Sequence, residues 1–338
     1  DEEAIFREDA RKLESIPRIT RRLIQEIRNP DVLRQAEKEV EFVKKNNLRI
    51  LFYTDTEYPQ RLSQCLDAPI LLYAKGHIDF NRKKVIAVVG TRNETRYGQD
   101  FCRGFIRDLA GRLPGIQIVS GLAYGIDIHA HRAALQNGLS TVAVLGHGLD
   151  RIYPSMHRQT AIEMLQHGAL LTEFPSGTNP DRHNFVKRNR IVAGMSDAVV
   201  VVESAEKGGS LTTADIANSY FREVFALPGR IHDKMSSGCN RLISDNKALL
   251  IQGVDDLMGH MGWMEEKKKE YPKQQELFVE LSDKEKKVYQ TLLHSGAMQV
   301  NTLAIELNMP VTDLFMTLLE LEMKNVVASL PGGMFKLI

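Results

Sequence analysis

The 338-residue chain lacks the features that mark membrane, secreted and metal-binding proteins. No apolar run approaches the ~20 residues that cross a bilayer, and no signal peptide opens the sequence. Its first residue is Asp1 rather than methionine, which leaves room for an upstream segment. The three cysteines, Cys65, Cys102 and Cys239, are too far apart for a metal-ligand pattern or a disulfide framework. We therefore expect a cytoplasmic protein of two or three domains, with no metal and no cofactor.

The chain also lacks a marked net charge, because 44 lysines and arginines face 43 aspartates and glutamates. The overall charge therefore gives no indication of nucleic-acid binding, which only local clusters of cations can indicate. Hydrophobic residues make up 43% of the sequence, as in an ordinary globular protein with a buried core.

The first 80 residues differ in pattern from the rest of the chain. Residues 1–48 are charged and helical in pattern, and the break at Pro17 predicts two short helices joined by a turn. Their apolar stripe consists of Leu13, Ile16, Ile19, Leu23 and Ile27. Residues 49–80 are expected to form a connecting region, with the short apolar runs ILFYT and APILLYAKG.

Residues 81–261 alternate short apolar runs with helical stretches. The runs are KVIAVVG, IQIVSG, TVAVLG, ALLTEF, DAVVVVES, EVFALPG and KALLIQG. Continuous apolar runs are typical of strands that are buried on both faces. The series predicts an α/β fold with a doubly wound, Rossmann-like parallel sheet, in which ligands bind beyond the carboxyl ends of the strands.

The rest of the chain is predicted to be a linker and a small domain. Residues 262–281 are a charged linker, and 282–338 begin with a helix capped by Ser282 or Asp283, with Glu285 in its first turn. Two further helical segments precede a hairpin with Pro331-Gly332-Gly333 at its tip. Three helices and a two-stranded wing describe a winged-helix domain.

Two candidate binding clusters follow the first two strands of the core. Gly90, Thr91 and Arg92 stand where a dinucleotide loop would carry its second glycine, and arginine is a fork of donors suited to phosphate. Ser120 and Gly121 end the next strand, near a predicted helix N-terminus that favours an anion. A surface arginine on a structural turn is the alternative for the first cluster. The nearby Asp127, His129 and His131 lack the spacing of metal ligands, and we expect structural roles for them.

Two further clusters lie later in the core. Lys187, Arg188, Asn189 and Arg190 form a basic run with Phe185 just before it, and cations with an aromatic suit single-stranded nucleic acid. A helix whose cations simply face water is the alternative. The last cluster, which would offer an oxyanion amides, hydroxyls and a lysine, consists of Lys207, Gly208, Gly209 and Ser210. The alternative for this cluster is a pair of glycines that only turn the chain.

The sequence offers many phosphate donors and few acids or bases. It contains no Gly-x-Ser-x-Gly elbow, no informative His-Asp-Ser set and no carboxylate pair at a strand end. This balance favours binding over catalysis.

Seven motifs together resemble the DNA-processing protein A family, also called DprA or Smf. They are VVGTRNETRYG, SGLAYGIDIHAH, AVLGHGLDRIYP, LLTEFPSGT, NFVKRNRIVAG, GGSLTTADIA and EVFALPG. The resemblance is dense over about residues 50–260, and it extends to the winged-helix tail. The N-terminal region resembles the end of the helix-hairpin-helix or SAM-like module that often precedes this core.

The resemblance implies a function that the residues alone do not. Family members bind incoming single-stranded DNA during natural transformation, protect it, and load the RecA recombinase onto it. The core is implied to be an extended Rossmann fold that forms a homodimer and holds DNA in a positively charged pocket. On this chain the family signatures fall on Gly90, Thr91 and Arg92, on Ser120 and Gly121, on Arg188, Asn189 and Arg190, and on Gly209 and Ser210. Departures from the family pattern are Val186, Phe221, Asn246 and Lys247.

Two rival functions stay open at this point. The core layout is similar to that of nucleotide phosphoribohydrolases, but Leu211 and Asp215 stand where their signature has glycine and glutamate. A winged-helix regulator of duplex DNA is the second rival. Its recognition helix would carry Asp313, Glu320 and Glu322 against one lysine, whereas a helix in a major groove normally brings cations. We therefore expect this tail to contact protein or its own chain.

Overall fold

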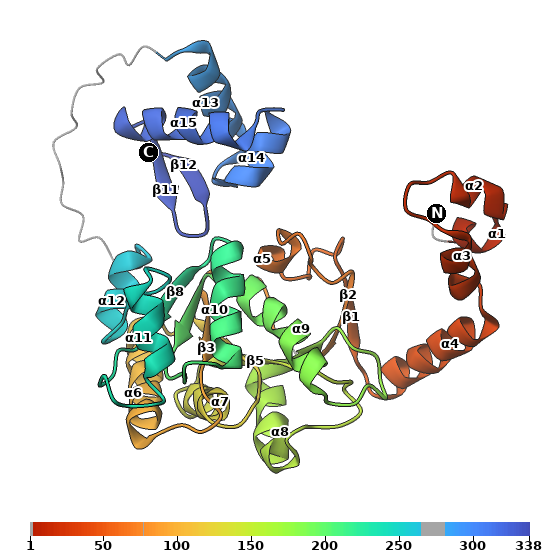
Figure 1. The fold of residues 1–338 in the computed structure, drawn as a ribbon, viewed down its shortest axis with the longest axis horizontal. Coiled ribbons are helices and arrows are strands. Elements are labelled where there is room, and N and C mark those ends of the chain that lie inside the picture. Colours follow the sequence, from red (N-terminus) through yellow and green to blue (C-terminus); the bar gives the residue numbers. More distant parts are fainter. Residues whose placement is uncertain (1–2, 77, 265–280) are drawn as a thin grey trace.

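A nine-stranded sheet forms the centre of the protein (Figure 1). The structure is a computed structural model and describes residues 3–76, 78–264 and 281–338, so most of the predicted linker lies outside the described residues. The strand order is β1-β2-β6-β5-β4-β3-β7-β8-β9. The strands are β1 (Arg49–Phe52), β2 (Leu71–Lys75), β3 (Val85–Val89), β4 (Gln117–Ser120), β5 (Ser140–Val144), β6 (Gly168–Thr172), β7 (Ala198–Val201), β8 (Glu223–Ala226) and β9 (Leu249–Leu250).

The chain winds outward from β3 in both directions. It passes through β4, β5 and β6 on one side, returns to the other side of β3 as β7, and continues to β8 and β9, with all these pairs parallel. The reversal lies between β3 and β7, where loops from both strands diverge and leave a crevice for a ligand. The predicted doubly wound fold is thus confirmed.

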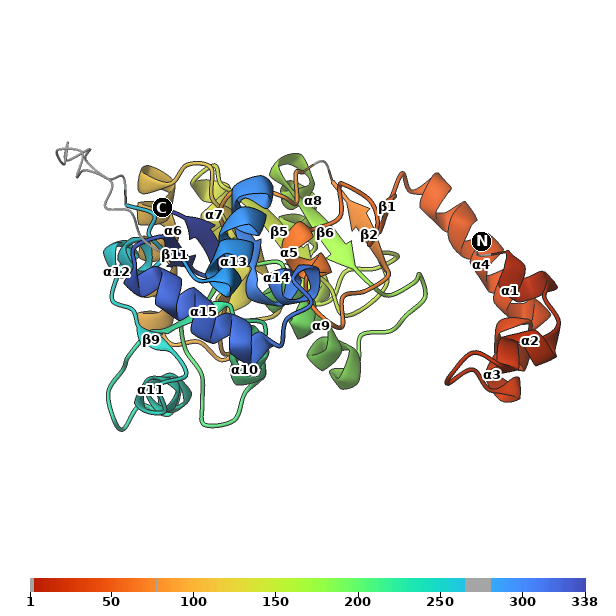
Figure 2. The same cartoon turned by 90° about the horizontal axis from the view of Figure 1, so that it is seen from above.

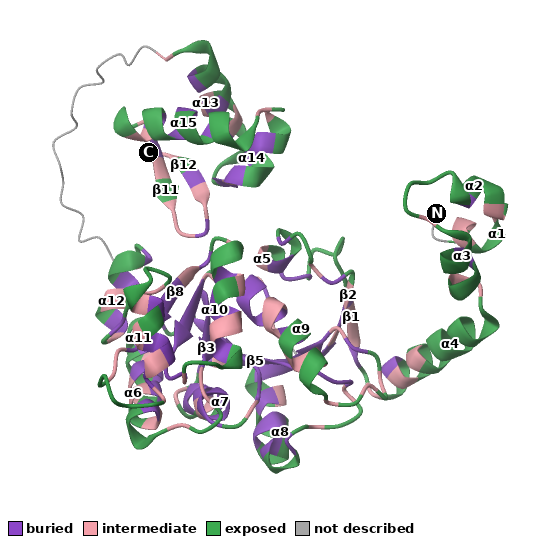
Figure 3. Ribbon diagram, in the orientation of Figure 1, coloured by how far each residue is buried: buried purple, intermediate pink, exposed green. Residues whose placement is uncertain are grey.

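Both faces of this sheet are buried, which explains the continuous apolar runs (Figure 3). Ile86 and Val88 of β3 face one core with α6 and α7, whereas Ala87 and Val89 face a second core with α9 and α10. The helices of the sheet region are α5 (Gln60–Ser63), α6 (Arg96–Arg112), α7 (Ile126–Gln136), α8 (Arg158–His167), α9 (Arg182–Gly194), α10 (Gly209–Ser219), α11 (Ser237–Ser244) and α12 (Val254–His260).

Residues 49–80 do more than connect, contrary to the expectation from their short apolar runs. The run ILFYT supplies β1, and APILLYAKG supplies β2, which pairs antiparallel with β6 and extends the sheet. Leu51 and Leu72 are buried against the same core as β3. The short runs are too brief to distinguish a strand from a buried loop, and pairing with β6 decides the outcome.

The N-terminal region folds into four helices, α1 (Ala4–Arg7), α2 (Ala10–Glu14), α3 (Arg21–Ile27) and α4 (Pro30–Lys45). The first three lie at the far end of α4 from the sheet in both Figure 1 and Figure 2. The predicted apolar stripe is only partly present, because Leu13 is buried while Ile16 and Leu23 are exposed, and Ile24, outside the stripe, is buried instead. The turn at Pro17 restarts the helical phase, so spacings counted across it do not describe one face.

The C-terminal domain is a winged helix, as predicted. Its elements are α13 (Asp283–Ser295), β10 (Met298–Gln299), α14 (Val300–Glu306), α15 (Val311–Met323), β11 (Val327–Leu330) and β12 (Met334–Leu337). Ser282 and Glu285 form a reciprocal capping box at α13, and Pro331-Gly332-Gly333 joins β11 to β12. The recognition helix α15 exposes Phe315, Met316 and Leu319 beside Asp313 and Glu320. An apolar and acidic surface is poorly suited to the phosphates of duplex DNA, and its contact with protein stays a prediction.

Among the described residues, no single helix is long and apolar enough to cross a membrane. Only α14 and α15, bent by 110°, reach that length and composition as a pair. Their apolar side chains Leu303, Leu314 and Leu318 form the core of the winged helix.

His131 of α7 gives the fold a dependence on pH. Its ring is fully buried, with Nδ1 2.7 Å from the Thr141 hydroxyl, and burial lowers its pKa to about 3. The unfolded chain takes up this proton near the usual pKa of about 6.5, so the stabilisation is complete above that pH and declines as the pH falls toward 3.

We therefore expect the free energy of unfolding to fall between pH 6.5 and 4, measured by urea denaturation. His131→Asn keeps a donor near Thr141 but has no titrating ring, so its decline should be shallower. Parallel pH profiles for the two proteins would contradict this account of acid sensitivity.

Candidate nucleic-acid interface

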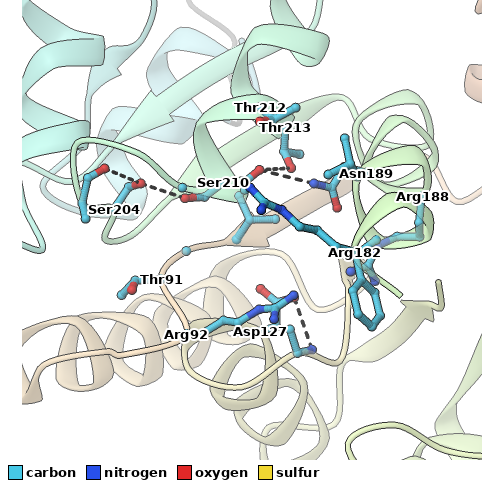
Figure 4. Close-up of a pocket in the computed structure, with 18 of the residues that line it drawn as sticks. Thr91, Arg92, Asp127, Arg182, Arg188, Asn189, Ser204, Ser210, Thr212 and Thr213 are labelled. Atoms are coloured by element: carbon cyan, nitrogen blue, oxygen red, sulfur yellow. Dashed lines mark hydrogen bonds between the residues drawn. The ribbon is translucent and has the colours of Figure 1, made fainter. Parts of the chain in front are cut away.

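A cavity of about 840 Å³ lies beyond the carboxyl ends of β3 and β7, at the reversal of strand order (Figure 4). Its walls come from residues 89–93 after β3, 180–189 at the start of α9 and 204–213 around the start of α10, with Tyr153 and Met235 closing the rim. Segments far apart in the sequence therefore meet at the place that the doubly wound fold reserves for a ligand.

The loop after β3 reaches the cavity because Gly90 allows close packing. A Cβ at Gly90 would lie 2.5 Å from the Ile126 side chain, so only glycine lets α7 approach this loop. Thr91 donates its amide to the Glu203 carbonyl at 2.7 Å, which ties the loops after β3 and β7 together. Arg92 is exposed, and its guanidinium lies 5.3 Å from the centroid of the Phe185 ring. This cation is therefore held over an aromatic face at the cavity.

Helix α9 presents one face to the cavity. Asp181 caps the helix by accepting the amide of Asn184 at 2.8 Å. From this start, four side chains that line the cavity follow helical spacing, Arg182, Phe185, Val186 and Asn189, and Arg188 lines it as well. Arg182 is exposed and reaches into the cavity across from Arg92 (Figure 4).

The same geometry turns two of the predicted cations away. Lys187 and Arg190 do not line the cavity, and both contact the buried carboxylate of Glu173, at 3.3 and 2.5 Å. Arg190 also donates to the Asp67 carbonyl. The basic run was expected to act as one unit, but a helix points neighbouring residues to different sides.

Arg188 is a structural residue of the cavity wall. It is 4% exposed, and its guanidinium donates to the carbonyls of Gly121, at 2.7 Å, and Val144. Burial lowers the pKa of Arg188 to about 10 and raises the pKa of the neighbouring Asp127 carboxyl, whereas their opposite charges act against both shifts. Its expected grip on a phosphate is thus replaced by bonds to the protein.

The cluster after β4 is likewise committed to the fold. Ser120 is fully buried and donates its hydroxyl to the Val88 carbonyl at 2.7 Å. The Gly121 amide, expected to serve as a free donor, binds the Asp127 carboxylate at 3.1 Å. A Cβ at Gly121 would meet the Arg188 guanidinium at 2.3 Å, so the glycine makes room for that side chain. Neither Ser120 nor Gly121 lines the cavity, and the donors of both are bonded within the protein.

The start of α10 supplies the open donors of the cavity. Gly208 precedes the helix, and Gly209 begins it, so the amides of Gly209 and Ser210 have no acceptor within the helix, whereas the Leu211 amide donates to the Gly208 carbonyl at 3.2 Å. Lys207 and Gly208 are exposed here. Ser210 is buried and donates to the Ser204 hydroxyl at 3.0 Å, while the Asn189 amide donates to the Gly209 carbonyl at 3.3 Å. These two bonds tie the start of α10 to β7 and α9.

An aromatic pair stands beside the cations. The rings of Tyr153 and Phe185 stack with centroids 5.8 Å apart and planes within 22°. Tyr153 is 41% exposed and enters from the loop after β5. No spacing in the sequence marks Tyr153, because it arrives from a separate loop. Arg182 lies five residues before the basic run in the sequence. It faces the cavity because it is the first residue of α9, directly after the cap Asp181.

The departures from the family pattern fall mostly outside the cavity. Val186 lines it as a continuous part of α9. Phe221 and Asn246 do not line it, and both adopt left-handed backbone conformations with φ of 56° and 53°. Such a conformation is the reason that a glycine suits these two positions.

Each carboxylate at the cavity is bonded to backbone amides of its own. Asp127 accepts the amides of Gly121 and Ala123, and Asp181 caps α9. His129 lies 3.1 Å from Glu94, outside the cavity lining. In the described residues, no three histidine, cysteine or carboxylate side chains come together as a metal site.

Known proteins share both the sequence and the fold. The family model for DNA recombination-mediator protein A matches residues 49–262, and the DprA winged-helix model matches residues 272–333. Protein Smf of Escherichia coli is 36% identical over 90% of this chain and 84% of its own length. DNA processing protein DprA of Streptococcus pneumoniae is 40% identical over 68% of this chain and 82% of its own length.

Two solved structures resemble the protein. DNA processing protein A from Streptococcus pneumoniae superposes with a TM-score of 0.62 at 37% identity, over 70% of this chain and 83% of that one. DNA processing protein A from Helicobacter pylori, solved to describe its single-stranded DNA binding mode, gives a TM-score of 0.57 at 30% identity, over 63% of this chain and 94% of that one. The chain therefore belongs to the DNA recombination-mediator protein A family, which comprises the proteins called DprA and Smf.

Proposed function

We propose that the cavity binds single-stranded DNA and that the protein acts as a recombination mediator in natural transformation. The observation that supports this most is the set of exposed cations Arg92, Arg182 and Lys207 around a cavity with an aromatic pair at its rim. Cations for the backbone and aromatic faces for the bases are what single strands require. The relative from Helicobacter pylori, with its single-stranded DNA binding mode, supports the same function.

Each part of the cavity then has a role toward the strand. Arg92, Arg182 and Lys207 contact phosphates, and the amides of Gly209 and Ser210 add neutral donors at the start of α10. Gly90, Thr91, Asn189 and Gly208 shape the same surface. Ser120, Gly121 and Arg188 hold the wall in place. Lys187 and Arg190 do not contact the strand, because both pair with the Glu173 carboxylate on the side of α9 away from the cavity.

The role beyond DNA binding rests on family membership. We propose that the bound strand is protected from nucleases, that RecA is loaded onto it, and that the core forms a homodimer. The RecA step is tested by strand exchange in which single-stranded DNA is first coated with single-strand-binding protein. The wild-type chain should shorten the lag before RecA begins strand exchange. A variant that no longer binds DNA should leave this lag unchanged.

We propose binding without catalysis. In the hydrolase alternative, Asp215 would act as the catalytic carboxylate. Its carboxylate instead lies 2.9 Å from the Lys247 ammonium on the exposed side of α10, and it is absent from the cavity lining. Release of free base from nucleoside monophosphates that Asp215→Asn abolishes would restore the hydrolase alternative.

The proposal is tested by titrating a labelled single strand and a matched duplex over a series of salt concentrations. Single-strand affinity should be independent of sequence and should fall steeply with salt. A plot of the logarithm of the association constant against the logarithm of the salt concentration should have a negative slope of about 0.7 for each phosphate contact. Removing residues 270–338 should leave this affinity unchanged. Tight, sequence-selective duplex binding that disappears with the deletion would favour the winged-helix regulator instead.

A further inference from the structure

The helical hairpin α2–α3 (Ala10–Ile27) is a concentrated source of positive charge far from the cavity. From Ala10 to Arg28 it carries six cations, Arg11, Lys12, Arg18, Arg21, Arg22 and Arg28, against Glu14 and Glu26, while Glu8 and Asp9 lie just before α2. The excess is local, because the whole chain has a net charge of +1. In a nearly neutral protein, a local cluster of cations is a stronger indication of a binding surface than the same cluster in a basic protein.

Three of these cations have no partner. In the described part of the chain, the side chains of Arg11, Arg18 and Arg21 make no hydrogen bond or ion pair, and all three are exposed. Their neighbours differ, since Lys12 pairs with Glu8 at 3.1 Å and Arg22 pairs with Glu26 at 2.9 Å. The three guanidinium groups are therefore available to an external anion.

The hairpin holds these cations on a fixed frame. Thr20 caps α3 by accepting the Leu23 amide, and Arg28 ties α3 to α1 by donating to the carbonyls of Ile5, at 3.0 Å, and Glu8. Arg18 sits in the turn with φ of 72°, a left-handed conformation that favours glycine or asparagine. Arg18 therefore occupies a turn position where arginine carries a conformational cost.

Helix α4, which carries the hairpin, is bonded to the loop that leads toward the cavity. The Glu39 carboxylate of α4 accepts both the amide, at 3.0 Å, and the hydroxyl of Ser176. Ser176 lies in the loop after β6 that leads into Arg182 at the start of α9. DNA that extends from the cavity past Arg182 would thus meet the element that carries the hairpin.

We propose that Arg18 and Arg21, with Arg11, form a second DNA site that binds the phosphodiester backbone. Guanidinium forks match phosphate geometry and are always charged, whatever the base sequence. This inference goes beyond the cavity, because it rests on the charges of the hairpin and stands even if the cavity holds no DNA.

The test compares two full-length variants that lose the same charge from the same region. Arg18→Gln with Arg21→Gln removes the unpartnered arginines of the hairpin. Arg7→Gln with Arg34→Gln removes exposed arginines that pair with Glu3 and Asp31. Both are titrated with a long single strand and with a duplex over a series of salt concentrations, and urea unfolding checks that each is folded.

If both arginines contact phosphates, the slope of log affinity against log salt should become shallower in the hairpin variant. The change should be about 1.4 on single strands or about 1.8 on duplex. A loss in either arm that the control lacks supports the site, and the affected arm tells which form of DNA it binds. Unchanged slopes in both arms, or an equal loss in the control, overturn it. Arg92→Ala is measured in parallel, so that failure of the hairpin site and failure of the cavity are told apart.

Discussion

Arg188→Met is expected to lower the free energy of unfolding by about 3–5 kcal/mol, because it removes a buried, hydrogen-bonded guanidinium that neighbours the buried Asp127 carboxyl. The carbonyls of Gly121 and Val144 would lose their donor, and Asp127 would stay buried without a neighbouring cation. The measurement is urea denaturation at pH 7. Any loss of DNA binding should follow from unfolding or from a collapsed cavity wall.

Two further variants serve as controls for this effect. Lys187→Met on the exposed side of α9 removes the same charge and should cost less than about 1 kcal/mol. Arg188→Lys keeps the charge but lacks the longer reach of the Nη1 atom that donates to both carbonyls, so its cost should be intermediate. An Arg188→Met protein of unchanged stability that no longer binds DNA would instead place this guanidinium on the strand.

Arg92→Ala is expected to weaken single-strand affinity by about 1–3 kcal/mol, which is roughly 5- to 150-fold, if it removes one charged hydrogen bond to a phosphate. The side chain is exposed, so the free energy of unfolding should change little. The salt dependence should also become shallower by about 0.7 in the logarithmic slope.

Arg96→Ala provides the matched control for Arg92. Arg96 begins α6 four residues later, has a side chain that is 94% exposed, and pairs with Asp100 rather than facing the cavity. It should leave both the affinity and the salt slope nearly unchanged. If the two alanine variants lose equal affinity, the effect is one of general charge and the cavity has no special role.

The doubly wound core could be predicted from the sequence because its physical signal is strong. Strands buried on both faces need continuous apolar runs, and all seven predicted runs are strands β3 to β9 of the sheet. The antiparallel edge formed by β1 and β2 could not be predicted in the same way. Its runs are short, and their place in the sheet depends on pairing with β6 across about 100 residues of chain.

The candidate site was predictable in its location but less so in its chemistry. Glycines at strand ends identified the loops that meet at the cavity, as Gly90 and Gly209 illustrate. The basic run could not be assigned to one surface from the sequence, because four consecutive residues of a helix point to different sides. Arg188 is buried, and Lys187 and Arg190 turn to Glu173. Burial of an arginine depends on carbonyls supplied by β4 and β5, which no local pattern reveals.

Photo-crosslinking of a bromouracil-substituted single strand, followed by peptide mapping, tests most directly whether the cavity holds DNA. We expect crosslinks to the peptides that contain Tyr153 and Phe185, the stacked rings at the rim. These crosslinks should weaken in Arg92→Ala and compete with unlabelled single strands. Crosslinks that map to the winged helix of residues 282–338, with none at the cavity, would contradict this expectation.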